Sequence, residues 1–153
     1  MRGADRIRID IDRCGWHCVH VLPENDCQVQ FTYTIGLSEK FRAPEVMVFG
    51  FPRERAHELL GVCAYLVANG EEIEVDIPDG RILQGGYKVV FREVSKVAFG
   101  EYLGTACRFF KGDTFRAVVL FVPDAQARYP WESGYNYIQV NEALGILCEG
   151  AVN

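Results

Sequence analysis

The sequence predicts an α+β domain whose mixed, mainly antiparallel sheet is curled or closed into a barrel, with two main helices. Three observations predict this class. Alternating or fully apolar runs typical of strands come first, a helical stripe follows them, and further strands surround a second helical stretch. Because strands and helices do not alternate regularly, a doubly wound parallel sheet fits the chain poorly.

Composition narrows the class of protein. The 153 residues are 49% hydrophobic and 24% charged, which is typical of one globular domain, so we expect a single domain over residues 1–153. The formal net charge is -5 and no run of Lys or Arg stands out, so we expect no nucleic-acid partner. No signal peptide is visible and no apolar run approaches the roughly 18 residues that cross a bilayer, so we expect a cytoplasmic protein without a membrane partner. Its six cysteines are then expected to be reduced thiols.

The first third of the chain predicts three strands. Residues 7–12 alternate apolar and charged side chains, which indicates a strand at a sheet edge. Residues 15–22 form the next predicted strand, and residues 28–37 return as its hairpin partner after a turn that contains Pro23. In this partner the side chains of Phe31, Tyr33 and Ile35 face one way and those of two threonines the other.

A central strand and a helix follow. Residues 38–43 are predicted to form a polar loop, and the apolar residues 46–51 a strand covered on both faces. A helix is predicted from Pro52 or Arg53 to the stop at Asn69-Gly70, because its apolar residues recur at helical spacing.

The second half repeats this alternation less clearly. We predict strands over residues 71–77, 87–94 and 115–122, and a helix from 95 or 96 to about 110. The tail from residue 125 is rich in aromatic residues and interrupted by proline, so we expect it to lie across the body of the domain, with one short helix over residues 141–148.

Four short motifs together resemble a known family. They are Gly15-Trp16-His17, Tyr33-Thr34-Ile35-Gly36-Leu37, Pro44-Glu45 with Val48-Phe49-Gly50, and Tyr129-Pro130-Trp131-Glu132 with Gly134-Tyr135. Their order and spacing over about residues 13–137 resemble the bacterial family called domain of unknown function 4262. The resemblance implies a small bacterial stand-alone domain, and it supplies no accepted activity and no catalytic residues.

The second of these motifs is a candidate ligand-binding turn. Hydroxyl groups and backbone amides beside a glycine bind phosphate or a flavin ring, which gives Tyr33, Thr34 and Gly36 as ligand-binding residues, with Trp131 shielding the ligand. The strand–loop–strand–helix layout also resembles the split-barrel flavin-binding proteins, and this analogy favours FMN and a homodimer. The alternative is that Gly36 ends a strand and the threonines face solvent.

Three ionisable residues inside the motifs are candidates for acid–base catalysis. They are His17, Glu45 and Glu132, and Trp131 would exclude water beside Glu132 and so raise the pKa of its carboxyl. The alternative is that all three have structural roles, with Glu45 in a turn and Glu132 in water.

A metal site is the third candidate. Cys14, Cys18, His20 and Cys27 lie on or near one predicted hairpin, and thiolate and imidazole are zinc ligands. Their spacing matches no Cys-x-x-Cys pair, so we expect core thiols and a hydrogen-bonded histidine, and we assign no metal.

Two functions are consistent with these observations. The first is a small-molecule-binding domain, with the flavin-type oxidoreductase as its most specific form and a pocket between residues 33–37 and 129–135. The second is a non-catalytic protein-interaction module that uses the aromatic C-terminal segment. The sequence assigns no reaction.

Overall fold

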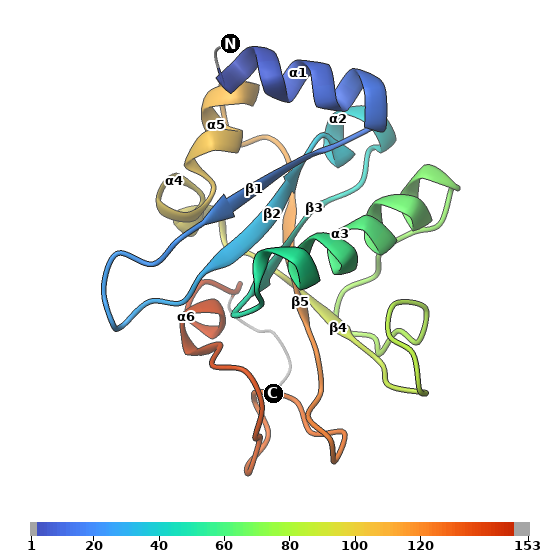
Figure 1. Cartoon of the computed structure of the whole chain (residues 1–153), viewed down its shortest axis with the longest axis vertical. Coiled ribbons are helices and arrows are strands. Elements are labelled where there is room, and N and C mark those ends of the chain that lie inside the picture. The colour runs from blue at the N-terminus through green and yellow to red at the C-terminus, as the bar shows by residue number, and fades with distance from the viewer. Residues whose placement is uncertain (1–2, 149–153) are drawn as a thin grey trace.

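The computed structural model describes residues 3–148, which form an open five-stranded sheet with helices on both faces (Figure 1). The strands are β1 (His17–Val21), β2 (Phe31–Ile35), β3 (Glu45–Phe49), β4 (Val90–Glu93) and β5 (Ala117–Phe121), in the order β1-β2-β3-β5-β4. The neighbours β3 and β5 are parallel and the other pairs are antiparallel. The predicted α+β class and mainly antiparallel sheet are confirmed.

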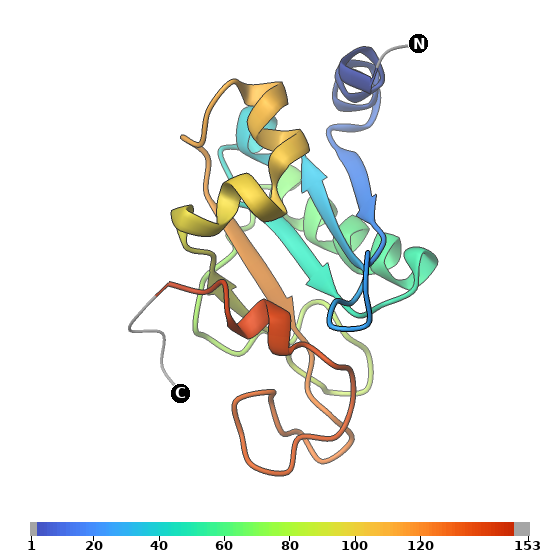
Figure 2. The ribbon, with the colours of Figure 1, turned by 90° about the vertical axis from the view of Figure 1, so that its left-hand side faces the viewer.

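Two layers of helix enclose the sheet (Figure 2). Helix α3 (Arg53–Ala68) covers one face, where its apolar stripe packs against Val46 and Val48 of β3. The opposite face packs against α1 (Gly3–Cys14), α4 (Phe99–Tyr102), α5 (Gly104–Phe110) and α6 (Asn141–Leu144). Strand β3 is therefore buried on both faces, as its continuous apolar run predicts.

The predicted edge strand over residues 7–12 is wrong, because this segment belongs to α1. Ile7 and Ile11, four residues apart, are buried on one side of the helix, whereas Ile9 between them is only partly buried. Ion pairs at the same spacing join Arg6 to Asp10 and Arg8 to Asp12. The charges that resemble one face of a strand also fit helical spacing, and the sheet of the described residues has five strands, with β1 at this edge.

The predicted polar loop over residues 38–43 is also wrong, because it contains the short helix α2 (Leu37–Phe41). The helix has no side-chain cap of its own, and the carboxylate of Glu45 accepts hydrogen bonds from the backbone N–H groups of its first turn. It ends at Phe41 and is followed by Arg42, whose backbone is left-handed with φ 57°.

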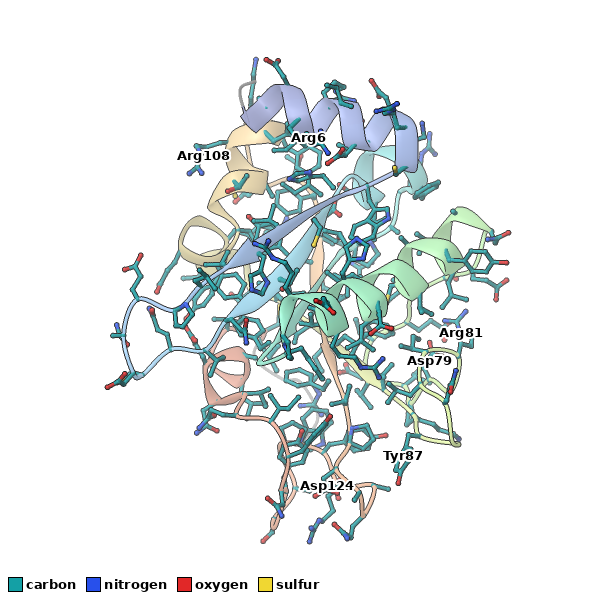
Figure 3. All side chains as sticks on the ribbon, in the orientation of Figure 1. Arg6, Asp79, Arg81, Tyr87, Arg108 and Asp124 are labelled. Carbon is teal, nitrogen blue, oxygen red and sulfur yellow. The ribbon has the colours of Figure 1, made fainter. Side chains whose placement is uncertain are left out.

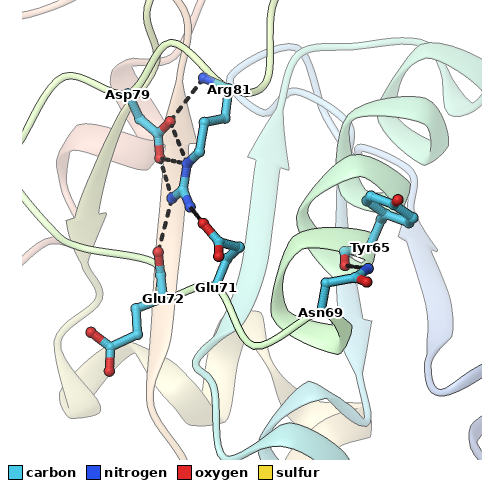
Figure 4. A network of polar contacts seen from close by, with 6 residues as sticks. All are labelled: Tyr65, Asn69, Glu71, Glu72, Asp79 and Arg81. Carbon is cyan, nitrogen blue, oxygen red and sulfur yellow. Dashed lines mark hydrogen bonds and ion pairs between the residues drawn. The ribbon is translucent and has the colours of Figure 1, made fainter.

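The predicted strand over residues 71–77 is wrong as well. Only Val75 pairs with a strand, through an isolated bridge to Phe91, and the left-handed backbone of Asp76 (φ 64°) interrupts the extended run. The segment is instead held by Arg81, whose guanidinium binds Asp79, Glu71 and the carbonyl of Glu72 (Figure 4).

The second predicted helix is correct only in part. Residues 96–110 form the 3-10 turn η1 (Lys96–Ala98), then α4 and α5, with the break at Leu103 (ψ 36°) just before Gly104. The tail crosses the body of the domain as predicted and ends in α6. Just before α6 it packs against Gly50, where an added Cβ would lie 2.1 Å from the side chain of Ile138. No helix within residues 3–148 has the length and apolar character needed to cross a membrane.

Candidate functional site

The structure brings three of the predicted site residues, Thr34, Gly36 and Glu45, together at the amino end of β3. Thr34 donates a hydrogen bond of 2.7 Å to Glu45, and the backbone N–H of Gly36 donates one of 3.0 Å to the same carboxylate. His17 is the register partner of Ile35, so it lies beside this turn on β1. Three of the family-like motifs therefore meet in space, which their separation in the sequence does not show.

The carboxylate at the centre of this cluster is enclosed. Glu45 is fully buried and accepts five hydrogen bonds, from the Thr34 hydroxyl, three backbone N–H groups and the Ser38 hydroxyl. Burial raises the pKa of Glu45, and the hydrogen bonds oppose this rise. Because every partner is a donor and none is a reacting group, the geometry supports a clamp that holds β2, α2 and β3 together.

Gly36 also has a packing role in this cluster. Its φ of 130° favours glycine, and a Cβ there would lie 2.9 Å from both the Gly15 carbonyl oxygen and Ile11. The space that a ligand would need next to the Gly36 backbone is therefore filled by the chain itself. The threonines predicted to face solvent in the alternative hypothesis, Thr32 and Thr34, are fully buried.

The other predicted residues of this end point elsewhere. The Nδ1 atom of His17 lies 2.7 Å from the carboxylate of Asp10, which fixes the imidazole against α1. Tyr33 is buried in the core on the opposite face of the sheet from Thr34, with Phe31, Ala106 and Leu103.

Trp131 and Glu132 lie at the other end of the sheet. The Trp131 ring packs edge-on against Phe121, the last residue of β5, whereas Gly36 binds Glu45, which is aligned with Ala117, the first residue of β5. Four strand residues correspond to roughly 13 Å. The pocket predicted between these segments is therefore not formed by these residues.

The local contacts of this pair are structural. Trp131 stacks on Tyr129, and the guanidinium of Arg92 lies 3.7 Å from the centre of its indole ring. Arg92 is buried, which lowers its pKa while Asp76 opposes the shift. Glu132 is exposed and accepts a hydrogen bond from the backbone N–H of Tyr129, so it closes a turn.

A cavity of about 700 Å³ opens at the carboxyl ends of the two parallel strands, β3 and β5. Ligands of open α/β sheets bind in this place, because the connections that leave parallel strands diverge there. The floor of the cavity is apolar, and its rim carries polar side chains such as those of Arg55, Gln84 and Asn136. The lining residues are Phe51, Arg55, Glu58, Leu59, Val62, Ile82, Leu83, Gln84, Tyr87, Val122, Pro123, Asp124, Ala125, Asn136 and Tyr137.

Asp124 builds one wall of this cavity. Its buried carboxylate accepts hydrogen bonds from the backbone N–H groups of Gln126, Arg128 and Asn136 and from the Arg128 guanidinium. Burial raises the pKa of Asp124, but these hydrogen bonds outweigh burial and bring the pKa to about 2. The carboxylate thereby fixes Asn136 at the cavity, on the side of the molecule where Figure 3 shows both Asp124 and Tyr87.

Two tyrosines of the fourth motif anchor the C-terminal segment near this wall without lining the cavity. The Tyr135 hydroxyl donates to the carbonyl of Val122, and the Tyr129 hydroxyl donates to the carbonyl of Lys88. Arg128 lies so close to Gly134 that a Cβ there would be 2.8 Å from its guanidinium. The fourth motif thus folds the C-terminal segment back over the end of β5 and positions the cavity without lining most of it.

Sequence reasoning missed every residue of this cavity, although one signal was present. Two predicted strands, the apolar residues 46–51 and the residues 115–122 in which Arg116 is the one charged residue, are each followed by a proline, Pro52 and Pro123. Had these strands been recognised as parallel neighbours, their carboxyl ends would have indicated this edge of the sheet.

The metal candidates are dispersed or otherwise engaged. Cys14 and Cys27 are exposed, and His20 pairs with the Thr32 hydroxyl and with Gln30. Within residues 3–148, no group of three or more His, Cys, Asp or Glu side chains is arranged to hold a metal ion.

Comparison with known proteins gives one match. The model of the family described as "Domain of unknown function (DUF4262)" matches residues 10–136, which include all four motifs. No curated protein and no solved structure matches the chain.

Proposed function

Because the chain belongs to the DUF4262 family, whose description assigns no activity, we propose a function from geometry: the protein binds a small molecule in the cavity at the carboxyl ends of β3 and β5. The observation that carries the proposal is the cavity itself. Its volume of about 700 Å³ lies within the range of small-molecule sites, and it combines an apolar floor with a few polar side chains.

The polar side chains are available for a ligand. Arg55, Gln84 and Asn136 line the cavity, and their side chains form no hydrogen bond with another residue of the described chain. The Tyr87 hydroxyl reaches the Ala125 carbonyl at 3.5 Å, too long for a strong hydrogen bond. The adjacent Gly85 and Gly86 both have positive φ, a backbone conformation that favours glycine and forms the turn before Tyr87.

The experiment is a thermal-shift screen of a small-molecule fragment library with a cavity-filling variant. Val62 lines the cavity from α3, whereas Tyr65 is exposed on the same helix. Fragments should stabilise the wild type and the control Tyr65→Phe, and Val62→Phe should lose the shift because its larger ring occupies the site. Fragments that stabilise Val62→Phe equally, or a library without any binder, would contradict the proposal.

The proposal also includes the more specific expectations from the sequence, of which the flavin-type oxidoreductase is the most readily tested. A flavin-type oxidoreductase predicts a yellow protein with flavin absorbance bands, and a colourless preparation would remove FMN. Bacterial origin, a cytoplasmic location with reduced cysteines, the homodimer and the absence of nucleic-acid and membrane partners stay predictions.

The alternative of a protein-interaction module has less support. Trp131 is packed against Phe121 and Arg92, and the hydroxyls of Tyr129 and Tyr135 are bonded to carbonyls of the domain. An aromatic surface for a partner would need these rings to face outward.

A further inference from the structure

We propose that the cavity recognises a zwitterion with an apolar body, of the size of an amino acid or a dipeptide. This inference rests on the proposed small-molecule function and names the ligand class. The observation behind it is the pairing of opposite charges on the rim above an apolar floor.

The two charges come from consecutive turns of α3. Arg55 and Glu58, three residues apart, both line the cavity, and the Nη1 atom of Arg55 lies 3.9 Å from Oε1 of Glu58. This distance is beyond a hydrogen bond, and the side chains are 49% and 68% exposed. Exposed pairs of this kind contribute little to stability, so a ligand can replace the contact at small cost.

The third charged residue of the lining is not available to a ligand. The side chain of Asp124 is fully buried, and Arg128 neutralises it at 2.9 Å. The described cavity lining therefore offers one cation and one anion, Arg55 and Glu58, which form only a weak contact with each other.

This charge balance selects the ligand. An anion attracted by Arg55 would be repelled by Glu58, and a cation attracted by Glu58 would be repelled by Arg55. A ligand with a single charge therefore gains little binding free energy here. A molecule that carries both a carboxylate and an ammonium group gives each side chain an opposite charge. The floor, which includes the buried side chains of Phe51, Leu59 and Val122, then takes the apolar part.

Isothermal titration calorimetry with four probes tests the inference. L-phenylalanine and L-alanyl-L-phenylalanine carry both charges, N-acetyl-L-phenylalanine carries only the carboxylate, and L-phenylalaninamide carries only the ammonium group. We expect at least one zwitterion to bind about tenfold more tightly than both singly charged probes, a difference that one well-placed charged contact supplies.

Variants assign the charges. Arg55→Gln should weaken the zwitterion about tenfold and remove its advantage over the amide, and Glu58→Gln should remove its advantage over the N-acetyl compound. Arg53→Gln and Glu54→Gln are matched controls, because these residues line a separate cavity on the same helix and should leave binding unchanged. All four positions are exposed, so the variants are expected to fold, which a thermal melt verifies.

Three outcomes would overturn the inference: neither zwitterion binds, a singly charged probe binds as well, or Arg55→Gln and Glu58→Gln bind like the wild type. The proposed function fails separately, when the fragment screen finds no binder that Val62→Phe excludes.

Discussion

The carboxylate of Glu45 meets only hydrogen-bond donors in the interior of the protein. Three of its five partners are backbone N–H groups at residues 36–38, and the Thr34 hydroxyl that donates to it also accepts from the N–H of Val46. The three backbone N–H groups can only donate, so they favour the ionised carboxylate and oppose the burial that raises the pKa of Glu45. One side chain thereby fixes a strand end, a helix start and the next strand.

We expect Glu45→Gln to lower the free energy of unfolding by about 3 kcal/mol, because the new amide group turns a donor toward buried N–H groups and leaves them unsatisfied. Urea unfolding at neutral pH measures the loss. Glu54→Gln, at an exposed position on α3, is the control and should change stability little. A Glu45→Gln protein as stable as the wild type would show that the clamp is not needed.

Asp124 predicts a pH dependence of stability. Its pKa of about 2 in the folded protein lies below the ordinary value of 3.8, so its contribution is complete above about pH 4 and is lost as the pH falls through about 2. Urea midpoints between pH 4 and pH 2 should therefore fall less steeply for Asp124→Asn than for the wild type. Equal slopes for the two proteins would contradict the role given to this carboxylate.

At the scale of elements, α1 shows how a charged alternation can mislead. In a strand, Ile7, Ile9 and Ile11 would share one face and be buried alike. In the helix, Ile7 and Ile11 are buried and Ile9 is only partly so. Arg8 also pairs with Glu39 in a bidentate contact that joins α1 to α2, which is a tertiary interaction that no local pattern contains.

Alanine substitution distinguishes the two arrangements. Ile11→Ala should lower the free energy of unfolding by about 2–4 kcal/mol, because it leaves a cavity beneath α1. Ile9→Ala should cost clearly less, because that side chain is partly in water. Thermal or urea unfolding of the two variants checks this, and equal losses would favour a strand-like environment for this segment.

The C-terminal segment is held by Trp131. Trp131→Ala should lower the free energy of unfolding by about 3 kcal/mol, since it removes the contact with Phe121 and leaves the buried Arg92 facing a void. Tyr65→Ala, an exposed aromatic on α3, is the matched control for urea unfolding. Unchanged stability with loss of ligand binding would give Trp131 a direct functional role instead.

At the scale of the whole molecule, the sequence predicts the elements that have a clear hydrophobic periodicity. It does not predict the elements that depend on contacts between distant residues. The hairpin of β1 and β2, the central strand β3, the helix α3 and the strand β5 all have clear local patterns, and all were predicted close to their observed bounds. The helix α2 depends on a carboxylate that is contributed from the next strand, and residues 71–77 are set by the side chain of Arg81. Neither influence is local in the sequence.

The site follows the same division. The motif residues were found, and three of the four motifs do meet, but Thr34, Gly36 and Glu45 fill their own space with one another. The cavity arises because β3 and β5 are parallel neighbours, although the chain visits α3, β4 and α5 between them. The spacing of residues in the sequence does not show that β3 and β5 pair, so it could not predict which residues line the cavity.

Shift mapping by ¹H–¹⁵N nuclear magnetic resonance with the fragment library tests most directly the proposal that ligands bind at the carboxyl ends of β3 and β5. We predict that binders shift the amide signals of the cavity-lining residues 82–84, 87, 122, 124, 125, 136 and 137. Shifts centred on residues 33–38, or spread over the surface without a focus at the cavity, would contradict it.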